Sequence, residues 1–344
     1  RRPPRSTLFP YTTLFRSMIG KVKIRHLFLL AWLAALSTKA QVSSENYVQT
    51  TERISDTQVL STTEYYDGLG RPFEMVEQKK TPDGANLIHL KEYDGLGRDW
   101  KTWLPVKDAS DFLSISAARS QGNNQYRDSH AFSLTEYDGS PLNRINTVEG
   151  VGAEWTSHPV KKDYLVNTSK YPLNCKYYRV SMQGQLQDKG YYPEGRLYVT
   201  KTTDENGNES YEFKNIAGNV ILKRTICSID EAADTYYIYD YRGNLAFVLP
   251  PNYQEEPSLD LYAYQYKYDG QGNCTWKKLP GCEPIYMKYD LSGRMIFLQD
   301  GNLRKKGLWE FYVYDELGRL ARSEEHTSEL QSLEDLVCRL LLEK

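Results

Sequence analysis

The stretch YDLSGR at Tyr289–Arg294, followed by the apolar run MIFL at 295–298, decides the fold of this chain. The side chain of Asp290 can accept hydrogen bonds from nearby backbone amides, and Gly293 can adopt the positive φ that a tight turn requires. Apolar residues resume directly after Arg294, as they do at the start of a second strand. The stretch therefore predicts a β-hairpin with a tight turn.

The same pattern occurs in six complete copies along the chain, and the later copies lie 21 to 29 residues apart. A degenerate copy spans 213–219, and another begins at Tyr137-Asp138 without the usual ending. A period of this size indicates stacked supersecondary units rather than one ordinary domain. The four fixed positions of the complete copies are Tyr66, Asp67, Gly70 and Arg71; Tyr93, Asp94, Gly97 and Arg98; Tyr239, Asp240, Gly243 and Asn244; Tyr268, Asp269, Gly272 and Asn273; Tyr289, Asp290, Gly293 and Arg294; and Tyr314, Asp315, Gly318 and Arg319.

Alternating tyrosines precede the turns, most clearly at Tyr262, Tyr264, Tyr266 and Tyr268. A period of two places these rings on one face of a strand. A single hairpin is marginally stable in water, so successive hairpins must pair edge to edge. The sequence predicts an all-β fold of successive antiparallel β-hairpins in one long, twisted sheet. The closing arginines are predicted to pair with the turn carboxylates or to stack on tyrosine rings.

The composition supports many short strands, since the 344 residues include 28 Tyr but only 10 Phe. Tyrosine and other aromatic residues are enriched in strands. The formal net charge is −2, with 43 Lys and Arg against 45 Asp and Glu. This balance argues against a basic nucleic-acid-binding protein.

The two ends of the chain differ from the rest. Segments 1–17 and 322–344 resemble translated sequencing adapters, so we expect them to be artefacts and the natural protein to continue past Ala321. The alternative is a genuine leader and a short C-terminal amphipathic helix.

Residues 18–40 have the three parts of a signal peptide. A basic start is followed by the ten-residue apolar run Leu27–Leu36, and small residues precede a cleavage site between Ala40 and Gln41. A ten-residue helix spans about 15 Å, half of a bilayer core, so a stable membrane span is not expected. A retained N-terminal anchor is the alternative. The sequence predicts an exported protein (periplasmic, cell-surface or secreted), in which disulfides are permitted.

Chemical motifs are scarce. Cys274 and Cys282 are close enough in sequence for a local disulfide, and free thiols are the equal alternative. Residues 204–209 alternate carboxylate and amide oxygens as a calcium loop does, but the misplaced glycine favours a hairpin turn. The histidines lack metal-ligand spacing, and no hydrolase, P-loop or dinucleotide motif occurs. We expect no catalytic activity, no metal and no cofactor.

The repeats resemble the RHS/YD-repeat family, whose unit is Tyr-Asp-x-x-Gly-Arg. The linkers at 103–106, 140–144, 248–251 and 278–284 are similar to those of long exported bacterial RHS proteins with a small N-terminal domain of unknown function. The resemblance implies that this chain forms an open segment of a spiralling β-sheet shell. It also implies a C-terminal toxin domain, enclosed by the shell, downstream of Ala321. A core segment that closes the shell and cuts off the toxin by aspartyl autoproteolysis would also lie there.

The expected domains are an N-terminal domain at 41–173, which carries the first YD motifs, and repeats at 174–321. Within the first, 114–119 predicts a helix start, 120–128 a polar loop, and Gly139–Pro141 an interruption of strand pairing.

The predicted function is that of a shell or scaffold that encloses or presents its own missing C-terminal effector. The alternative is a cell-surface adhesion or carbohydrate-binding protein, because tyrosine rows with Asn, Asp and Gln nearby can stack on sugars. The simpler interpretation is that these tyrosines pack within the sheet. The tyrosines concerned are Tyr236, Tyr237, Tyr239, Tyr264 and Tyr266.

No nucleic-acid partner is expected.

Overall fold

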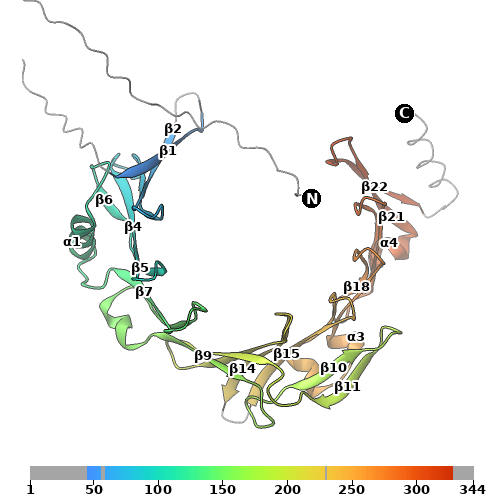
Figure 1. The fold of residues 1–344 in the computed structure, drawn as a ribbon. Coiled ribbons are helices and arrows are strands. Elements are labelled where there is room, and N and C mark those ends of the chain that lie inside the picture. Colours follow the sequence, from blue (N-terminus) through green and yellow to red (C-terminus); the bar gives the residue numbers. More distant parts are fainter. Residues whose placement is uncertain (1–44, 56–58, 229–230, 328–344) are drawn as a thin grey trace, which may run out of the picture. The chain divides into compact units, whose positions relative to one another are not determined.

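A computed structural model of the chain describes residues 45–55, 59–228 and 231–327 (Figure 1). The predicted signal peptide and its cleavage site at Ala40 and Gln41 lie outside these residues. So do segment 1–17 and residues 328–344. No helix among the described residues is long and apolar enough to cross a membrane.

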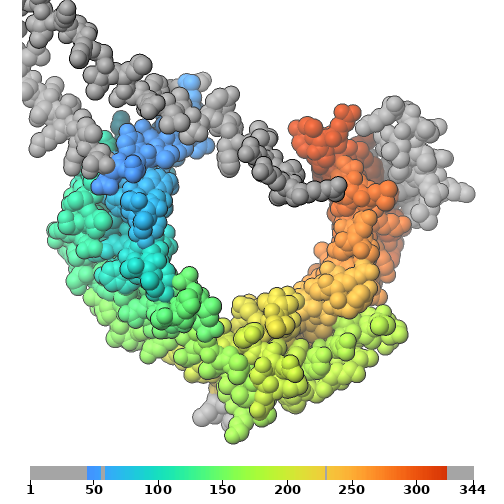
Figure 2. Space-filling model, in the orientation of Figure 1, coloured from blue at the N-terminus to red at the C-terminus, as the bar shows by residue number. Residues whose placement is uncertain are grey.

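Within these described residues, twenty strands form one sheet, and each of its pairings is antiparallel. The hairpins follow one another in chain order (Figure 1), and the colours of Figure 2 change in the same order over the surface. The prediction of an all-β fold of successive antiparallel hairpins is confirmed. The strands of this sheet are β1 (Asn46–Arg53), β2 (Val59–Tyr66), β3 (Pro72–Glu77), β4 (Asn86–Tyr93), β5 (Asp99–Trp103), β6 (Val106–Asp108), β7 (Phe132–Tyr137), β8 (Ile145–Glu149), β9 (Val160–Val166), β12 (Tyr198–Thr203), β13 (Glu209–Lys214), β14 (Val220–Ser228), β15 (Glu231–Tyr239), β16 (Leu245–Leu249), β17 (Tyr264–Tyr268), β18 (Cys274–Lys278), β19 (Ile285–Tyr289), β20 (Met295–Gln299), β21 (Leu308–Tyr314) and β22 (Leu320–Thr327).

A second, two-stranded sheet and a few short helices complete the fold. The two strands, β10 and β11, belong to an excursion of the chain between β9 and β12, which pair with each other directly. The remaining elements are β10 (Lys176–Val180), β11 (Leu186–Tyr191), α1 (Ile115–Tyr126), η1 (Ala153–Ser157), α2 (Pro251–Glu255), α3 (Leu259–Tyr262) and α4 (Gly301–Lys306).

One face of the sheet is covered in two places, and a hydrophobic cluster lies under each cover. In β4, alternate side chains such as Ile88 and Leu90 are buried. They belong to a first cluster, which includes Ala118 of α1. The second cluster joins β12–β16 to the β10–β11 hairpin, with Phe213 and Leu222 fully buried. Period-two alternation thus gives this sheet a covered face and an open face.

Helix α1 corrects one prediction. Ser114 caps its first turn, as the predicted helix start requires, because its hydroxyl accepts from the backbone N–H of Ala117. The helix does not give way to a polar loop at residue 120 but continues to Tyr126. Gly122 lies against the indole of Trp103, so packing on the sheet outweighs the low helix propensity of this polar stretch.

Two further predictions about strands were wrong. Gly139–Pro141 does not interrupt the strand pairing, because β7 before it and β8 after it pair with each other. The loop between these strands is longer than in the other repeats, and the backbone N–H of Asp138 closes it by donating to Arg144 O at 2.8 Å. Tyr262 does not share the strand face of Tyr264, because it ends helix α3, whose first turn is capped by Ser258.

Arg224 fastens the β10–β11 excursion to the sheet. Its side chain is buried and pairs with both carboxylate oxygens of Asp234 on β15, at 2.7 and 2.6 Å. The same guanidinium donates to the backbone oxygens of Pro172 and Asn174 at the start of the excursion. A buried arginine with all these partners holds the second cover in place, and removal of one partner would leave a buried charge unpaired.

Glu74 is a buried carboxyl group under the first cover. It is 1% exposed, and one oxygen accepts from the backbone N–H of Leu113 at 2.9 Å. The other oxygen has no partner among the described residues. Burial raises the pKa of Glu74 to about 7, against an ordinary value of 4.5. The folded state therefore holds the proton more tightly than the unfolded chain does.

This burial predicts a pH-dependent stability cost. Below about pH 4.5 Glu74 is protonated in both the folded and the unfolded state, and its burial costs no stability through ionisation. As the pH rises towards 7, the free energy of unfolding falls by about 3 kcal/mol, because only the unfolded chain releases the proton readily. Glu74→Gln should therefore raise the free energy of unfolding at pH 8 and change it little at pH 4.5, measured by urea unfolding. Glu205→Gln, at a partly exposed glutamate in a turn, is the control at both pH values. An equal effect of Glu74→Gln at the two pH values would contradict the assignment.

Candidate functional site

Each YD motif forms the same closed turn, which the first copy illustrates. The backbone N–H of Gly70, whose φ is +77°, donates to Asp67 O at 2.9 Å, and Asp67 N–H donates to Arg71 O at 3.0 Å. Asp67 Oδ1 accepts from the backbone N–H groups of Leu69 and Arg71. Asp67 Oδ2 accepts from Arg71 Nε at 2.8 Å. One carboxylate thus satisfies two backbone donors and holds the closing side chain.

The other copies repeat this geometry, with Arg Nε or Asn Nδ2 on the second carboxylate oxygen. The contact is 2.7 Å for Arg98–Asp94, Arg294–Asp290 and Arg319–Asp315, 3.1 Å for Asn244–Asp240 and 3.0 Å for Asn273–Asp269. The segment from Asp204 to Asn208 has the same turn, which confirms the prediction of a hairpin turn rather than a calcium loop. The spacing of Asp204, Gly207 and Asn208 matches that of the other turns, so the sequence could have identified this additional copy.

The closing arginines also reach the next hairpin. The guanidinium of Arg71 lies over the Tyr93 ring at 4.6 Å, that of Arg98 over Tyr137 at 4.4 Å, and that of Arg294 over Tyr314 at 5.2 Å. The prediction that these arginines pair with carboxylates or stack on tyrosines is confirmed in both parts. Arg319 pairs with Asp315, and no described aromatic ring lies over it.

These three tyrosines, and three others at the equivalent position, bind the preceding hairpin through their hydroxyl groups. In each case the phenol donates to the backbone carbonyl of the residue that directly follows the previous closing residue. This contact was not foreseen, and it explains why the motif begins with Tyr rather than Phe. The six bonds are Tyr93 to Pro72, Tyr137 to Asp99, Tyr164 to Ile145, Tyr268 to Leu245, Tyr289 to Cys274 and Tyr314 to Met295, at 2.7 to 3.1 Å.

We call this set of contacts the turn ladder: the Asp-closed turns, the closing residues and the tyrosines of the hairpins that follow. Because neighbouring strands alternate in direction, its turns lie at the same end of the strands, except the Asp204 turn between β12 and β13, which lies at the opposite end. Arg144 closes the longer Asp138 loop and also takes part, since its guanidinium lies over the Tyr164 ring at 5.0 Å. The ladder couples each local turn to the register of the next strand pair.

Hydrogen bonding sets the charge state of the turns. The backbone N–H and guanidinium of Arg71 lower the pKa of Asp67, and the Asn273 amide followed by its backbone N–H lowers the pKa of Asp269. A lowered folded-state pKa stabilises the fold above the ordinary value, and the contribution is lost as pH falls through the lowered one. The turns are therefore fully charged at neutral pH.

The turn at Asn215 departs from the rest. Asn215 Oδ1 accepts from the backbone N–H groups of Ala217 and Asn219, as the aspartates do. Where the aspartates have a second carboxylate oxygen, Asn215 has an amide nitrogen, which cannot accept a hydrogen bond. The side-chain amide of Asn219 therefore lacks the acceptor that Asn208, Asn244 and Asn273 find in their turns. Among the described residues, Tyr239 of the next hairpin also makes no hydroxyl bond to the strand before it. The turn ladder is interrupted here.

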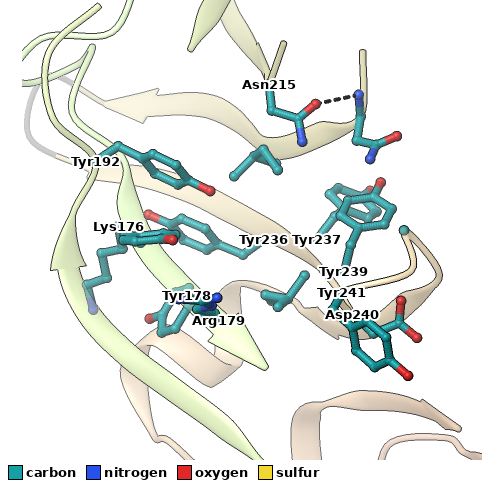
Figure 3. Close-up of a pocket in the computed structure, with 15 residues that line it drawn as sticks. Lys176, Tyr178, Arg179, Tyr192, Asn215, Tyr236, Tyr237, Tyr239, Asp240 and Tyr241 are labelled. Atoms are coloured by element: carbon teal, nitrogen blue, oxygen red, sulfur yellow. Dashed lines mark hydrogen bonds between the residues drawn. The ribbon is translucent and has the colours of Figure 1, made fainter. Parts of the chain in front are cut away.

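A pocket of about 300 Å³ lies at this interruption, and Figure 3 shows the side chains around it. It is lined by the Asn215 and Asp240 turns, by β15 and by the β10–β11 excursion. Seven of its fifteen lining residues are tyrosines. Two pairs of them pack on each other, Tyr177 with Tyr192 at 4.5 Å and Tyr178 with Tyr236 at 5.2 Å between ring centroids.

The tyrosines singled out in the sequence differ in their surroundings. Tyr236 is 2% exposed and packs on Tyr178, whereas Tyr264 is 37% exposed. Tyr237 and Tyr239 line the pocket. Packing within the sheet therefore accounts for Tyr236, and other tyrosines of the set remain accessible.

The structure has no disulfide between Cys274 and Cys282, and both are free thiols. Cys274 begins β18 and Cys282 lies in the turn beyond its end, where its N–H donates to Leu279 O. About 13 Å of extended strand separates the start of β18 from its end, well beyond the reach of a disulfide. Of the two alternatives, free thiols are the one found.

No group of three or more His, Cys, Asp or Glu side chains within 45–55, 59–228 and 231–327 could hold a metal ion. The turn aspartates are bonded within their own turns. The described residues bring together the contacts that join hairpins and, beside the Asn215 turn, a pocket lined by tyrosines.

Comparisons with known proteins give two results. Residues 37–166 match the family model described as "Domain of unknown function (DUF6443)". No curated protein is significantly similar to this chain in sequence.

Among solved structures, the chain is similar to "Crystal Structure of TcdB2-TccC3 without hypervariable C-terminal region", with a TM-score of 0.54 and 16% identity over 82% of this chain and 13% of that chain. It is also similar to "Crystal Structure of TcdB2-TccC3-Cdc42", with a TM-score of 0.53 and the same identity and coverage. The fold is shared. The chain spans a small part of the length of these structures.

The turn ladder predicts unequal costs for two similar substitutions. Arg98→Ala removes the Asp94 pair, the ring contact with Tyr137 and a bond to Asp138 O. It should lower the free energy of unfolding by about 1–2 kcal/mol. Arg319→Ala is the matched control, because the Arg319 side chain is 74% exposed. This substitution should lower the free energy of unfolding by at most about 0.5 kcal/mol. Equal costs in urea unfolding would show that the contact between hairpins contributes nothing.

Proposed function

We propose that this chain is a segment of an RHS-type shell, a non-catalytic scaffold that encloses or presents a C-terminal effector encoded beyond Ala321. The observation that carries the proposal is the turn ladder, which joins each hairpin to the next by one repeated set of contacts. Such contacts suit a protein whose task is to extend one sheet over a long distance.

The shared fold supports this role. One of the matched TcdB2-TccC3 structures is described as lacking a "hypervariable C-terminal region", so the protein that it represents has one. A repeated sheet followed by a variable end is the organisation that the sequence resemblance implies for this chain. We infer that its principal partner is its own C-terminal domain, held as cargo.

We further propose the limits of the mature segment. Residues 18–40 act as a signal peptide, cleaved between Ala40 and Gln41, so that the protein is exported. The N-terminal domain occupies 41–173, which contains nearly all of the matched segment 37–166. The repeats occupy 174–321, and segments 1–17 and 322–344 are adapter-like artefacts.

The shell proposal predicts the neighbouring gene sequence. Sequencing the locus outward from the codons of Met18 and Ala321 should replace the adapter-like codons. It should then reveal further Tyr-Asp repeats, a closing core segment and a variable domain. A reading frame that ends within about one repeat of Ala321 would overturn the proposal, because the sheet could not then enclose a domain.

Export has its own test. Expression of the natural gene in a bacterial host should give a protein outside the cytoplasm whose N-terminal residue is Gln41, as identified by mass spectrometry. Replacing Lys21, Lys23 and Arg25 by Glu should retain the uncleaved protein in the cytoplasm, because the basic start of a signal peptide is required. Cleavage elsewhere, or none, would contradict the assignment.

A further inference from the structure

A large apolar side chain stands at the tip of almost every turn of the turn ladder. Each of these residues comes one or two positions after the Asp or Asn that closes the turn, and each is 73% to 95% exposed. A single exposed leucine is common in folded proteins, but a row of them at one structural position is not. We call this set the apolar rim: Leu69, Leu96, Ile216, Tyr241, Leu291 and Leu317.

The apolar rim lies at one end of the strands, because its six turns all lie there. Leu142, in the longer loop that Arg144 closes, is 63% exposed at the same end. The Asp204 turn has the same hydrogen bonds but lies at the opposite end, and its corresponding residues are Glu205 and Asn206. The apolar tips therefore belong to one end of the sheet and are not a requirement of the turn geometry.

The rim residues are separate points rather than one continuous patch. From the Asn215 turn onward, successive turns are two strands apart, which corresponds to about 10 Å. A folded partner would need sockets at this same spacing. The fluid boundary between lipid headgroups and acyl chains accepts apolar side chains at any spacing.

The turns below the rim occupy most of their own backbone donors. In the Asp290 turn, four of the five N–H groups from Asp290 to Arg294 donate within the turn, two of them to Asp290 Oδ1. A backbone group that already has a partner costs less free energy to move out of water than a free one does. This turn can therefore enter an apolar boundary without losing its hydrogen bonds.

The rim also has little net charge. Arginine neutralises the aspartate in four of its turns, and Asn215 carries no charge in a fifth. In the remaining turn, Asp240 is accompanied by Arg242. The rim therefore has no excess of cations for an anionic surface, and apolar contact is what it offers.

We propose that the apolar rim binds the surface of a lipid bilayer by inserting its side chains between the headgroups of zwitterionic phospholipids. The strands remain in water, and only the turn tips reach the boundary with the acyl chains. Tyr241 suits this position because its ring is apolar, while its hydroxyl accepts from Arg242 Nε at 2.9 Å. The proposal concerns the described turns alone and does not depend on the shell role.

A matched pair of added leucines tests the surface. Gln271→Leu supplies a tip to the Asp269 turn, which lacks one, and Asn206→Leu makes the same change at the same position of the Asp204 turn. Partition of the full chain is measured by flotation with phosphatidylcholine vesicles, at the lipid concentration that floats half of the wild type. Gln271→Leu should strengthen partition about fivefold, and Asn206→Leu should leave it within about twofold. The apolar run 27–36 is the same in every variant, so the differences report the turns.

Removal of tips should have the opposite effect. Leu96→Ser and Leu291→Ser should each weaken partition about fivefold, and neither should lower the thermal midpoint, because both side chains are exposed. An increase from about 0.1 M to about 1 M NaCl should not release the protein, since apolar insertion is not screened by salt.

Tryptophan fluorescence reports insertion directly. The added indole of Leu291→Trp should shift to shorter wavelength on vesicles and be quenched by brominated phosphatidylcholine, whereas that of Asn206→Trp should not. Equal gains for Gln271→Leu and Asn206→Leu, or an unquenched indole in Leu291→Trp, would overturn the proposal. A Gln271→Leu protein that dimerises in sedimentation velocity without lipid, and floats no better than the wild type, would assign the rim to a second copy of the chain and overturn it as well.

Discussion

In each repeat, one aspartate oxygen accepts two backbone amides of the turn, and the other oxygen holds the closing arginine or asparagine. The turn is thereby closed by contacts within five consecutive residues, such as Asp67 to Arg71. The fixed guanidinium then presents its flat face to a tyrosine of the next hairpin, as Arg71 does to Tyr93. That tyrosine returns its hydroxyl to the preceding strand. A short-range contact therefore dictates the register of a long-range pairing.

This coupling matters because much of the sheet has little core. In the part of the chain that the structure describes, the two buried clusters lie under α1 and under the β10–β11 excursion. From β17 to β21 the side chains are mostly half-buried, so apolar burial alone would specify register weakly there. Bonds such as Tyr289 to Cys274 O and Tyr314 to Met295 O supply directional contacts at each junction. The sheet can thus be extended without a cover over every strand.

What could be predicted from the sequence is what depends on contacts within a few residues. The hairpins, the Asp-closed turns and the partners of Arg71 or Arg294 all follow from the motif. The length of α1 could not be predicted, because Gly122 is helical through its contact with Trp103. The role of Arg144 could not be predicted, because the loop that it closes is longer than the turn of the motif. The pocket depends on the excursion at 167–197, whose position no local pattern specifies.

The interruption of the turn ladder and the buried Arg224 explain each other. Where β12–β15 lie under the excursion, Arg224 binds Asp234 across the strands and Pro172 O and Asn174 O in the cover. The register of these strands is then fixed by buried contacts, and the turn contacts become dispensable. Asn can replace Asp at position 215 with little cost to the fold, which releases two amides at a surface where tyrosines already converge. A turn can therefore lose its contacts with the next hairpin at the place in a repeat sheet where a cover has taken over their structural role.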